Sequence, residues 1–252
     1  MRHFFTIPAL ALTLAACGDK SAAPAGPASG PTSADAASTA PAVVAPAGQN
    51  WVDVVTVTPE GGFRMGNPDA RVKLVEFASL TCPHCREFHE AATATIKSKY
   101  VASGNVSYEF RNFVLNGPDY AATVLARCQG ASTFFGLLDS FFMDQAGWTE
   151  PFSRIAKADQ EALGNMPEDQ AVRRLAELGG LADYVKLRGI PRAKFDQCLA
   201  DPAQMKAIND LRNLAVNDLK LTGTPSFIIN GAVQEGVFTW ADLEPKLQTA
   251  LR

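Results

Sequence analysis

The sequence predicts an α/β fold in which a strand, a helix and a second strand are separated from a final hairpin by an all-helical insertion. Two short runs of β-branched, apolar and aromatic residues, 71–79 and 106–115, flank a segment with helical periodicity. Residues 118–221 carry alanine, leucine and charged residues at helical spacing and contain no convincing strand. Strand character returns at 227–237.

The composition is that of a globular protein without unusual charge. The chain has 252 residues, of which 47% are hydrophobic and 19% are charged, and its formal net charge is −3. This composition is sufficient for a substantial core, and the lack of a basic excess leads us to expect no nucleic-acid partner. No apolar run reaches the roughly 18 residues that a membrane-spanning helix needs.

The N-terminus predicts a signal for export. Arg2 and His3 precede the apolar run Phe4–Ala16, which ends in small residues, as secretory signals do. The sequence at the end of this run, Leu14-Ala15-Ala16-Cys17-Gly18, resembles a bacterial lipoprotein signal, which implies a signal peptide over 1–17 that ends at a lipidated Cys17. The alternative is a soluble signal with a coincidental cysteine. Either form leads to a compartment where disulfides persist, and we expect a periplasmic protein that is held to a membrane by its lipid alone.

Residues 18–50 predict a flexible linker. Alanine, proline, glycine and serine dominate this stretch and aromatic residues are absent, so it cannot bury enough apolar surface to fold. A flexible chain of this length reaches roughly 30 Å. We expect the folded part to follow, with one α/β domain over 51–117 and 222–252 and a helical insertion over 118–221.

The remaining elements follow from periodicity and turn signals. After the first strand, apolar residues recur at spacings of three and four and give one helical face, and a second strand then completes a strand–helix–strand unit. Asn230-Gly231, between Phe227–Ile229 and Val233–Val237, indicates a tight hairpin. A short helix follows from Trp240. The apolar face of the first helix is formed by Cys85, Phe88, Ala92 and Ile96.

The insertion is rich in aromatic residues, which allow two interpretations. They could form a wall that binds peptides, or they could be the core of the insertion, which is the commoner situation for large apolar side chains. We favour the core. The residues are Phe134, Phe135, Phe141, Phe142 and Trp148.

A pair of cysteines lies where the first strand gives way to the helix. Cys82 is expected at the helix N-cap, and Pro83 occupies the first helical position, where its missing N–H costs nothing. Free backbone N–H groups and the positive end of the helix dipole then face the Cys82 sulfur and favour its thiolate. Cys85, one turn further on, is expected to face the core. This arrangement makes Cys82 the attacking and leaving sulfur and Cys85 the resolving one.

His84 lies between the two cysteines, where its ring could donate a hydrogen bond to the Cys82 sulfur and lower the pKa of that thiol further. A pair whose reduced form is favoured in this way gives its disulfide away. Zinc binding is a weaker alternative, because a second pair of ligands is missing, and we expect no metal and no cofactor. A purely structural disulfide would close almost no loop, and an inert reduced pair is unexpected outside the cytosol.

These features together resemble the DsbA type of thiol-disulfide oxidoreductase in the thioredoxin superfamily. The resemblance covers about residues 60 to 250 and rests on three features: Cys82-Pro83-His84-Cys85 after a strand, the helical insertion, and the sequence TGTPSFIING at 222–231. It implies a thioredoxin fold with an inserted helical domain. It also implies that Pro225 is cis and lies beside the cysteines, and that the backbone of Thr224 pairs with an extended substrate peptide.

The resemblance also marks Glu76, six residues before Cys82, as a buried acid beneath the resolving cysteine. A charge on an apolar strand is costly, so Glu76 would have a raised pKa and would exchange a proton with Cys85. The alternative is a structural ion pair with a lysine or arginine. We interpret His89 as part of a solvated helix face rather than as a second catalytic histidine.

Two cysteines of the insertion, Cys128 and Cys198, remain. Because free thiols are a liability in an oxidising compartment, we expect a structural disulfide between them, with two buried apolar cysteines as the alternative.

The sequence thus predicts an exported enzyme that donates its Cys82–Cys85 disulfide to reduced or misoxidised exported proteins. By resemblance, a membrane quinone reductase of the DsbB type would reoxidise it. The alternatives are a disulfide isomerase or reductase, a peptide-binding chaperone without turnover, and a factor dedicated to one client. Family isomerases usually add an N-terminal dimerisation domain, for which the region before Arg71 is short.

Overall fold

The computed structural model of the chain describes residues 41–252. The predicted signal peptide, Cys17 and most of the predicted linker lie outside this part. The described end of the linker lies along the folded part, because the Val43 N–H donates to the Ser103 carbonyl over 2.8 Å and the Trp51 indole N–H donates to the Val43 carbonyl over 2.7 Å. Within residues 41–252, no helix combines the length and the apolar character that crossing a membrane would require.

A six-stranded mixed sheet forms the centre of this part, in the order β1-β2-β4-β3-β5-β6. The two central strands, β3 and β4, are parallel and are joined by α1 and the π-helix η2, which is the predicted strand–helix–strand unit. The other pairs are antiparallel. The strands are β1 (Val55–Val57), β2 (Phe63–Met65), β3 (Val72–Ala78), β4 (Val106–Asn112), β5 (Ser226–Ile229) and β6 (Ala232–Val233), and the connecting helices are α1 (Pro83–Thr95) and η2 (Ile96–Val101).

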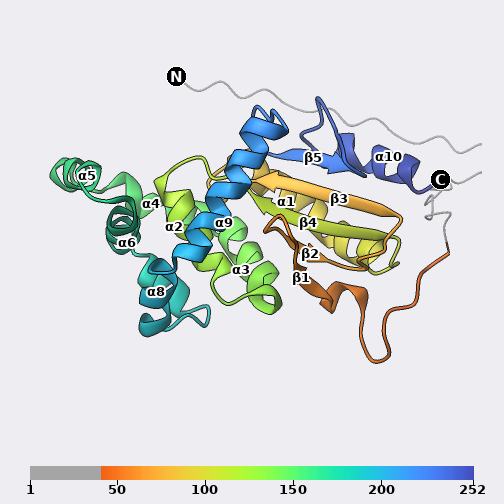
Figure 1. Ribbon diagram of the computed structural model, residues 1–252, viewed down its shortest axis with the longest axis horizontal. Coiled ribbons are helices and arrows are strands. Elements are labelled where there is room, and N and C mark those ends of the chain that lie inside the picture. Colours follow the sequence, from red (N-terminus) through yellow and green to blue (C-terminus); the bar gives the residue numbers. More distant parts are fainter. Residues whose placement is uncertain (1–40) are drawn as a thin grey trace, which may run out of the picture. The chain divides into compact units, whose positions relative to one another are not determined.

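Helices cover both faces of the sheet. Figure 1 shows α9 (Pro202–Asn213) in front of the strands and α1 behind them. Along β3, Leu74 and Ala78 belong to the large core cluster that includes α1, whereas Phe77 belongs to a smaller cluster with Ala215 after α9. Side chains alternate between the faces of a strand, so Glu76 points into the large cluster beneath α1.

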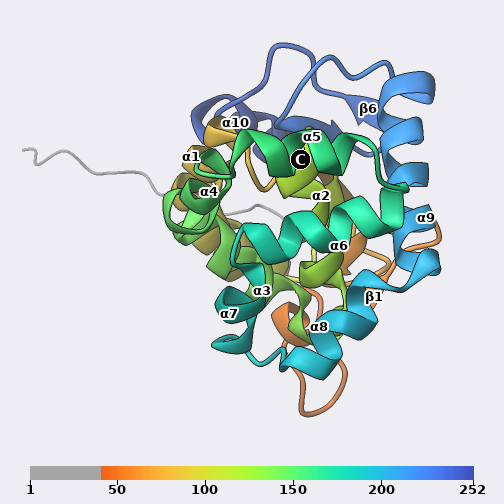
Figure 2. The same cartoon turned by 90° about the vertical axis from the view of Figure 1, so that its left-hand side faces the viewer.

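The insertion gathers its helices at one end of the sheet (Figure 1), and Figure 2 views them from that end. A disulfide joins Cys128, at the end of α2, to Cys198 in α8. With the two cysteines 70 positions apart in sequence, such a cross-link contributes about 4 kcal/mol in the chain-entropy model. The helices are α2 (Gly117–Arg127), α3 (Ala131–Met143), α4 (Gln145–Ser153), α5 (Lys157–Gly164), α6 (Glu168–Leu178), α7 (Leu181–Lys186) and α8 (Arg192–Leu199), followed by α9 and the π-helix η3 (Leu214–Asp218).

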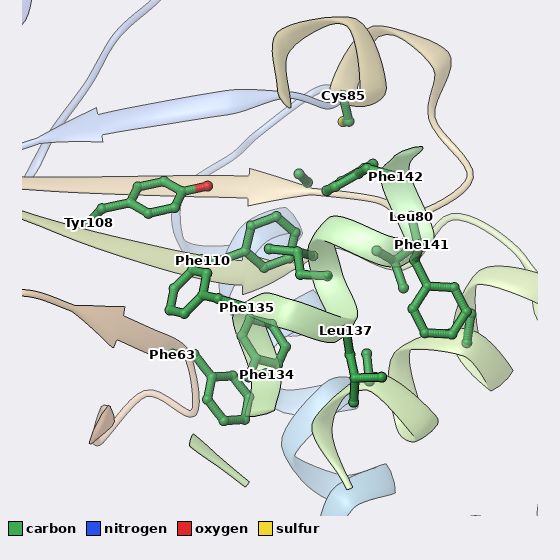
Figure 3. Packing of buried hydrophobic residues seen from close by; sticks show 14 of the residues in the cluster. Phe63, Leu80, Cys85, Tyr108, Phe110, Phe134, Phe135, Leu137, Phe141 and Phe142 are labelled. Atoms are coloured by element: carbon green, nitrogen blue, oxygen red, sulfur yellow. The ribbon is translucent and has the colours of Figure 1, made fainter. Parts of the chain in front are cut away.

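The aromatic residues of α3 join the insertion to the sheet. The rings of Phe134 and Phe63 stack with centroids 3.8 Å apart, and Phe134 also contacts Phe110 of β4 at 5.8 Å. Figure 3 shows this stacked pair, with Cys85 and Phe142 at another end of the same cluster. The aromatic residues of the insertion named above are all buried, so their interpretation as core is correct and the peptide-binding wall is wrong.

The fold class is therefore confirmed, and the differences from the predicted elements are local. The hairpin of β1 and β2 was not predicted, because strands of three residues are too short to show a period. The hairpin turn forms, with Asn230 at φ 49° and Gly231 at φ 84°, but β6 ends at Val233 rather than at Val237. Gly236 adopts φ 70° and redirects the chain there. The C-terminal helix, α10 (Trp240–Ala250), packs Leu243 and Leu247 into the core.

Candidate active site

The structure places Cys82 at the N-cap of α1, with Pro83 in the first turn. The backbone of Cys82 is extended (φ −79°, ψ 120°), and no side chain caps the helix. The first N–H groups of α1 therefore remain available to the Cys82 sulfur. Cys82 is 7% exposed and Cys85 is fully buried. Both are free thiols. Solvent thus reaches the first sulfur and not the second.

Hydrogen bonds to its sulfur lower the pKa of Cys82 from 9.0 to about 5. The largest contribution comes from the Cys85 thiol, and burial opposes it. The Thr224 side chain and the backbone N–H groups of Cys85 and His84 add to the lowering. The Thr224 carbonyl, 3.4 Å from the sulfur, accepts a hydrogen bond only from the neutral thiol. Donors therefore outnumber acceptors around this sulfur, and the anion is favoured.

Cys85 experiences the opposite environment. Burial raises the pKa of its thiol well above 9.0, and its hydrogen bond to the Cys82 sulfur and the charges of Cys82 and Glu76 raise it further. At neutral pH the reduced pair therefore holds one anion, on Cys82, and one proton, on Cys85.

Glu76 lies beneath this pair on β3 and is 2% exposed. Burial raises the pKa of its carboxyl from 4.5 to about 8, and the Tyr108 hydroxyl, which donates to Oε2 over 2.6 Å, lowers it in part. No ion pair to Glu76 occurs within the described part of the chain, which disfavours the structural alternative. Tyr108 of β4 was missed because only the pairing of two strands places it beside Glu76.

The loop before β5 completes the site. The Thr224-Pro225 peptide bond is cis, Pro225 is buried, and the contact between the Cys82 sulfur and the Thr224 carbonyl places this loop beside the first cysteine. Thr224 itself is half-buried.

The two histidines of α1 differ from expectation. The side chain of His84 is 76% exposed and its Nδ1 lies 3.2 Å from Glu87, so its backbone N–H, and not its ring, contacts the Cys82 sulfur.

His89 is buried, with Nε2 3.0 Å from Asp139 of α3, and its ring packs against the ring of Phe142. The prediction that His89 lies on a solvated face is wrong, because α3 covers that side of α1.

In the part of the chain that the structure describes, no group of three His, Cys, Asp or Glu side chains is arranged to hold a metal ion. The groups that the site does bring together are the two thiols, the buried acid and the cis-proline loop.

Comparison with known proteins agrees with this geometry. The family model described as thioredoxin matches residues 58–248. The chain belongs to the thioredoxin family. Within this family, it resembles the crystal structure of a protein-disulfide isomerase from Novosphingobium aromaticivorans, with 33% sequence identity and a TM-score of 0.71, over 75% of this chain and 96% of that one. Wolbachia pipientis α-DsbA1 shares 25% identity with a TM-score of 0.60, over 78% of this chain and 92% of that one.

Among the curated relatives, a Rickettsia bellii protein named as a protein-disulfide oxidoreductase is 28% identical over 204 residues, which are 77% of this chain and 70% of that protein. A relative from Rickettsia prowazekii is 30% identical over 68% of this chain, and the match spans only 55% of that longer protein. The DsbA-like thioredoxin fold and the enzyme class, a thiol-disulfide oxidoreductase, are thereby confirmed.

The geometry of the site predicts that the Cys82 and Cys85 thiols ionise at very different pH values. In the reduced protein, the rate at which iodoacetamide alkylates Cys82 should rise with pH through a midpoint near 5, because its thiolate is favoured there. Cys85 should remain unmodified up to pH 9. Peptide mapping by mass spectrometry separates the two positions. A Cys82 midpoint between 8 and 9, as for a free thiol, would contradict the arrangement.

Glu76 predicts a pH dependence of stability in the oxidised protein, where Cys82 does not titrate. Burial raises the pKa of the carboxyl from 4.5 to about 8 in the reduced protein, where the Cys82 charge adds to the increase, and burial alone still raises it in the oxidised protein. The favourable contribution of the neutral carboxyl is therefore complete below pH 4.5 and is lost as pH rises through the raised pKa. The Glu76→Gln variant should therefore exceed the wild type at pH 8 by roughly 3 kcal/mol in the free energy of unfolding, and match it near pH 5.

Urea denaturation at the two pH values measures this difference. Glu235→Gln, at an exposed glutamate, is the matched control and should follow the wild type at both. Equal stability of Glu76→Gln and wild type at pH 8 would show that the carboxyl has an ordinary pKa in the fold.

Proposed function

We propose that this protein is an oxidase that donates the Cys82–Cys85 disulfide to exported proteins. The observation that carries the proposal is the unequal environment of the two sulfurs, in which Cys82 is stabilised as an anion and Cys85 is kept neutral. This asymmetry favours the reduced pair, and a pair that favours reduction oxidises other dithiols.

The reaction transfers two electrons from the substrate. A substrate thiolate attacks the Cys82 sulfur, a mixed disulfide forms, and the bond between Cys82 and Cys85 breaks with Cys85 as the leaving group. The second substrate thiolate then attacks the substrate sulfur of the mixed disulfide. Cys82 leaves as a thiolate, and the low pKa of its thiol makes it a good leaving group. The substrate gains a disulfide and the enzyme keeps both electrons.

Glu76 supplies the proton that this sequence needs. With a pKa of about 8, its carboxyl is mostly protonated at pH 7, so it can protonate Cys85 when that sulfur leaves. Reoxidation runs the transfer in reverse, and Glu76 accepts the proton as Cys85 attacks. The Tyr108 hydroxyl, 2.6 Å from Oε2, stabilises the carboxylate while the proton is away. The Thr224 backbone next to Pro225 would pair with the substrate peptide.

The direction of the reaction follows from the size of the asymmetry. At pH 7, a thiol with a pKa near 5 instead of 9.0 stabilises the reduced form by roughly 2 kcal/mol, after allowance for water at the exposed edge of the sulfur. This corresponds to an increase of about 40 mV in the reduction potential. The contribution favours an oxidase over a reductase. Isomerisation is the second candidate, since the similar Novosphingobium aromaticivorans protein is called a protein-disulfide isomerase.

The cellular context of the proposal comes from the N-terminal sequence. An exported chain lipidated at Cys17 would work in the periplasm, close to a membrane, on reduced or misoxidised proteins. A membrane quinone reductase of the DsbB type would return the pair to its disulfide, in keeping with the DsbA-like fold.

Replacing single cysteines tests the activity. Cys82→Ser should abolish the oxidation of a reduced, unfolded ribonuclease, because no sulfur remains to accept the substrate. Cys85→Ser is the matched variant, and it should accumulate mixed disulfides with the substrate that non-reducing electrophoresis detects. A Cys82→Ser protein that still promotes ribonuclease refolding as well as the wild type would identify a chaperone and contradict the oxidase.

Metabolic labelling tests the anchor. Cells that express the full chain with a labelled fatty acid should attach the label to the wild type and to Cys82→Ser, but not to Cys17→Ser. Cys17→Ser should also be released from the membrane fraction. Absence of label from the wild type would refute lipidation and leave a soluble exported protein.

A further inference from the structure

The segment that delivers Cys82 to the helix, residues 79–82, makes few bonds of its own. Within it, the Cys82 N–H donates to the Ser79 carbonyl over 3.2 Å, and the Thr81 N–H donates to the Ser79 hydroxyl over 3.2 Å. Leu80 is fully buried, so its backbone N–H and carbonyl must find partners in the protein. Both partners come from the helical insertion.

Asp119 of α2 holds the first half of the segment. Its fully buried carboxyl accepts the Ser79 hydroxyl over 2.6 Å and the Leu80 N–H over 3.0 Å. The same carboxyl accepts the Leu115 N–H over 2.9 Å, which ties the segment to the chain that leads from β4 into the insertion. These bonds fix where the segment leaves β3.

Gln145, the first residue of α4, holds the second half. Its side-chain Nε2 donates to the Leu80 carbonyl over 2.8 Å and to the Cys82 carbonyl over 3.0 Å. The residue is 7% exposed, and the two hydrogens of one amide nitrogen account for both bonds. One side chain, 63 positions away from Cys82 in sequence, thus joins the carbonyls on either side of Thr81.

We infer that Gln145 is a positioning residue for the nucleophilic cysteine, which it holds through the Cys82 carbonyl so that the sulfur stays over the first N–H groups of α1. The Cys82 carbonyl also accepts the Arg86 N–H, over 3.2 Å, which is the first backbone bond of the helix. The second bond, from Gln145, fixes the orientation of the Cys82 peptide group. That orientation determines whether the sulfur faces the N–H groups of His84 and Cys85.

The inference rests on the proposed function in one respect, since it assumes that the Cys82 thiolate is the reactive group. It gives the helical insertion a part in the redox chemistry itself, because Gln145 and Asp119 both belong to it and neither touches the sulfur.

The test replaces Gln145 with methionine, which keeps the length and shape of the side chain and removes both donors. The readout is the pH midpoint of Cys82 alkylation by iodoacetamide in the reduced full chain, since a midpoint does not depend on how fast the thiolate itself reacts. We expect the midpoint of Gln145→Met to rise by about one pH unit, which lowers the alkylation rate below the midpoint about tenfold. The reduction potential should fall in parallel.

Gln129→Met is the matched control, because Gln129 also donates from its amide to one backbone carbonyl, that of Gly189, over 3.0 Å, in a part of the insertion that does not contact Cys82 or Cys85. It should keep the wild-type midpoint. Gln145→Asn, which retains a buried amide but is too short to reach both carbonyls, should move the midpoint in the same direction, and it decides the question if Gln145→Met does not fold.

An unchanged midpoint in the folded Gln145 variants, or an equal shift in Gln129→Met, would overturn the inference. A wild-type midpoint between 8 and 9 would instead remove the basis of the proposed function. The two failures are therefore distinguishable.

Discussion

The start of α1 places a cysteine sulfur over backbone N–H groups that have no partner within the helix, and much of the active site depends on this contact. Any anion at a helix N-terminus is stabilised by these groups and by the helix dipole. Here the anion is the Cys82 thiolate, which receives its largest stabilisation from the Cys85 thiol and a further contribution from the backbone N–H groups of Cys85 and His84. The Cys85 sulfur, one turn further along, lies in the core, where a charge is disfavoured. The disulfide between them would therefore join one good leaving group and one poor one.

The cost of this arrangement appears in the surrounding structure. The Glu76 carboxyl is buried on the central strand next to the cysteine pair, and among residues 41–252 its one hydrogen-bond partner is the Tyr108 hydroxyl. Such a carboxyl destabilises the fold whenever it is ionised. A core of stacked aromatic rings and the Cys128–Cys198 disulfide supply stability elsewhere. The insertion contributes both to stability and to the active site. It carries much of the aromatic core, and it also carries the Gln145 amide and the Asp119 carboxyl that hold the segment before Cys82.

Much of the architecture was predictable from local sequence patterns. The strand before Cys82, the helix with Phe88, Ala92 and Ile96 on its buried face, the helices of the insertion and the Asn230-Gly231 turn each follow from a short-range period or turn signal. The hairpin of β1 and β2 gave no such signal. Likewise, the periodicity of α1 could not show that α3 covers His89, because burial on that side depends on packing between distant segments.

The site was predictable where neighbours in sequence create it and unpredictable where tertiary contacts do. Cys82, Pro83 and Cys85 are placed by one strand–helix junction. The ring of His84 was expected to assist the Cys82 sulfur, but the ring is exposed, and the sulfur is stabilised mainly by the Cys85 thiol and further by the Thr224 side chain and backbone N–H groups. Tyr108 reaches Glu76 only through the pairing of β3 with β4, and Gln145 reaches the Cys82 carbonyl only because α4 packs against the segment.

The most direct test of the account is the equilibrium of the Cys82–Cys85 pair with glutathione, which gives its reduction potential. Thioredoxin and DsbA themselves provide the reference values, at about −270 mV and about −120 mV. A stabilised Cys82 thiolate predicts a reduction potential closer to the DsbA value than to the thioredoxin value. It also predicts a lower potential in variants in which the start of α1 no longer stabilises this thiolate. A potential close to that of thioredoxin would contradict the account, because the pair would then keep its disulfide rather than donate it.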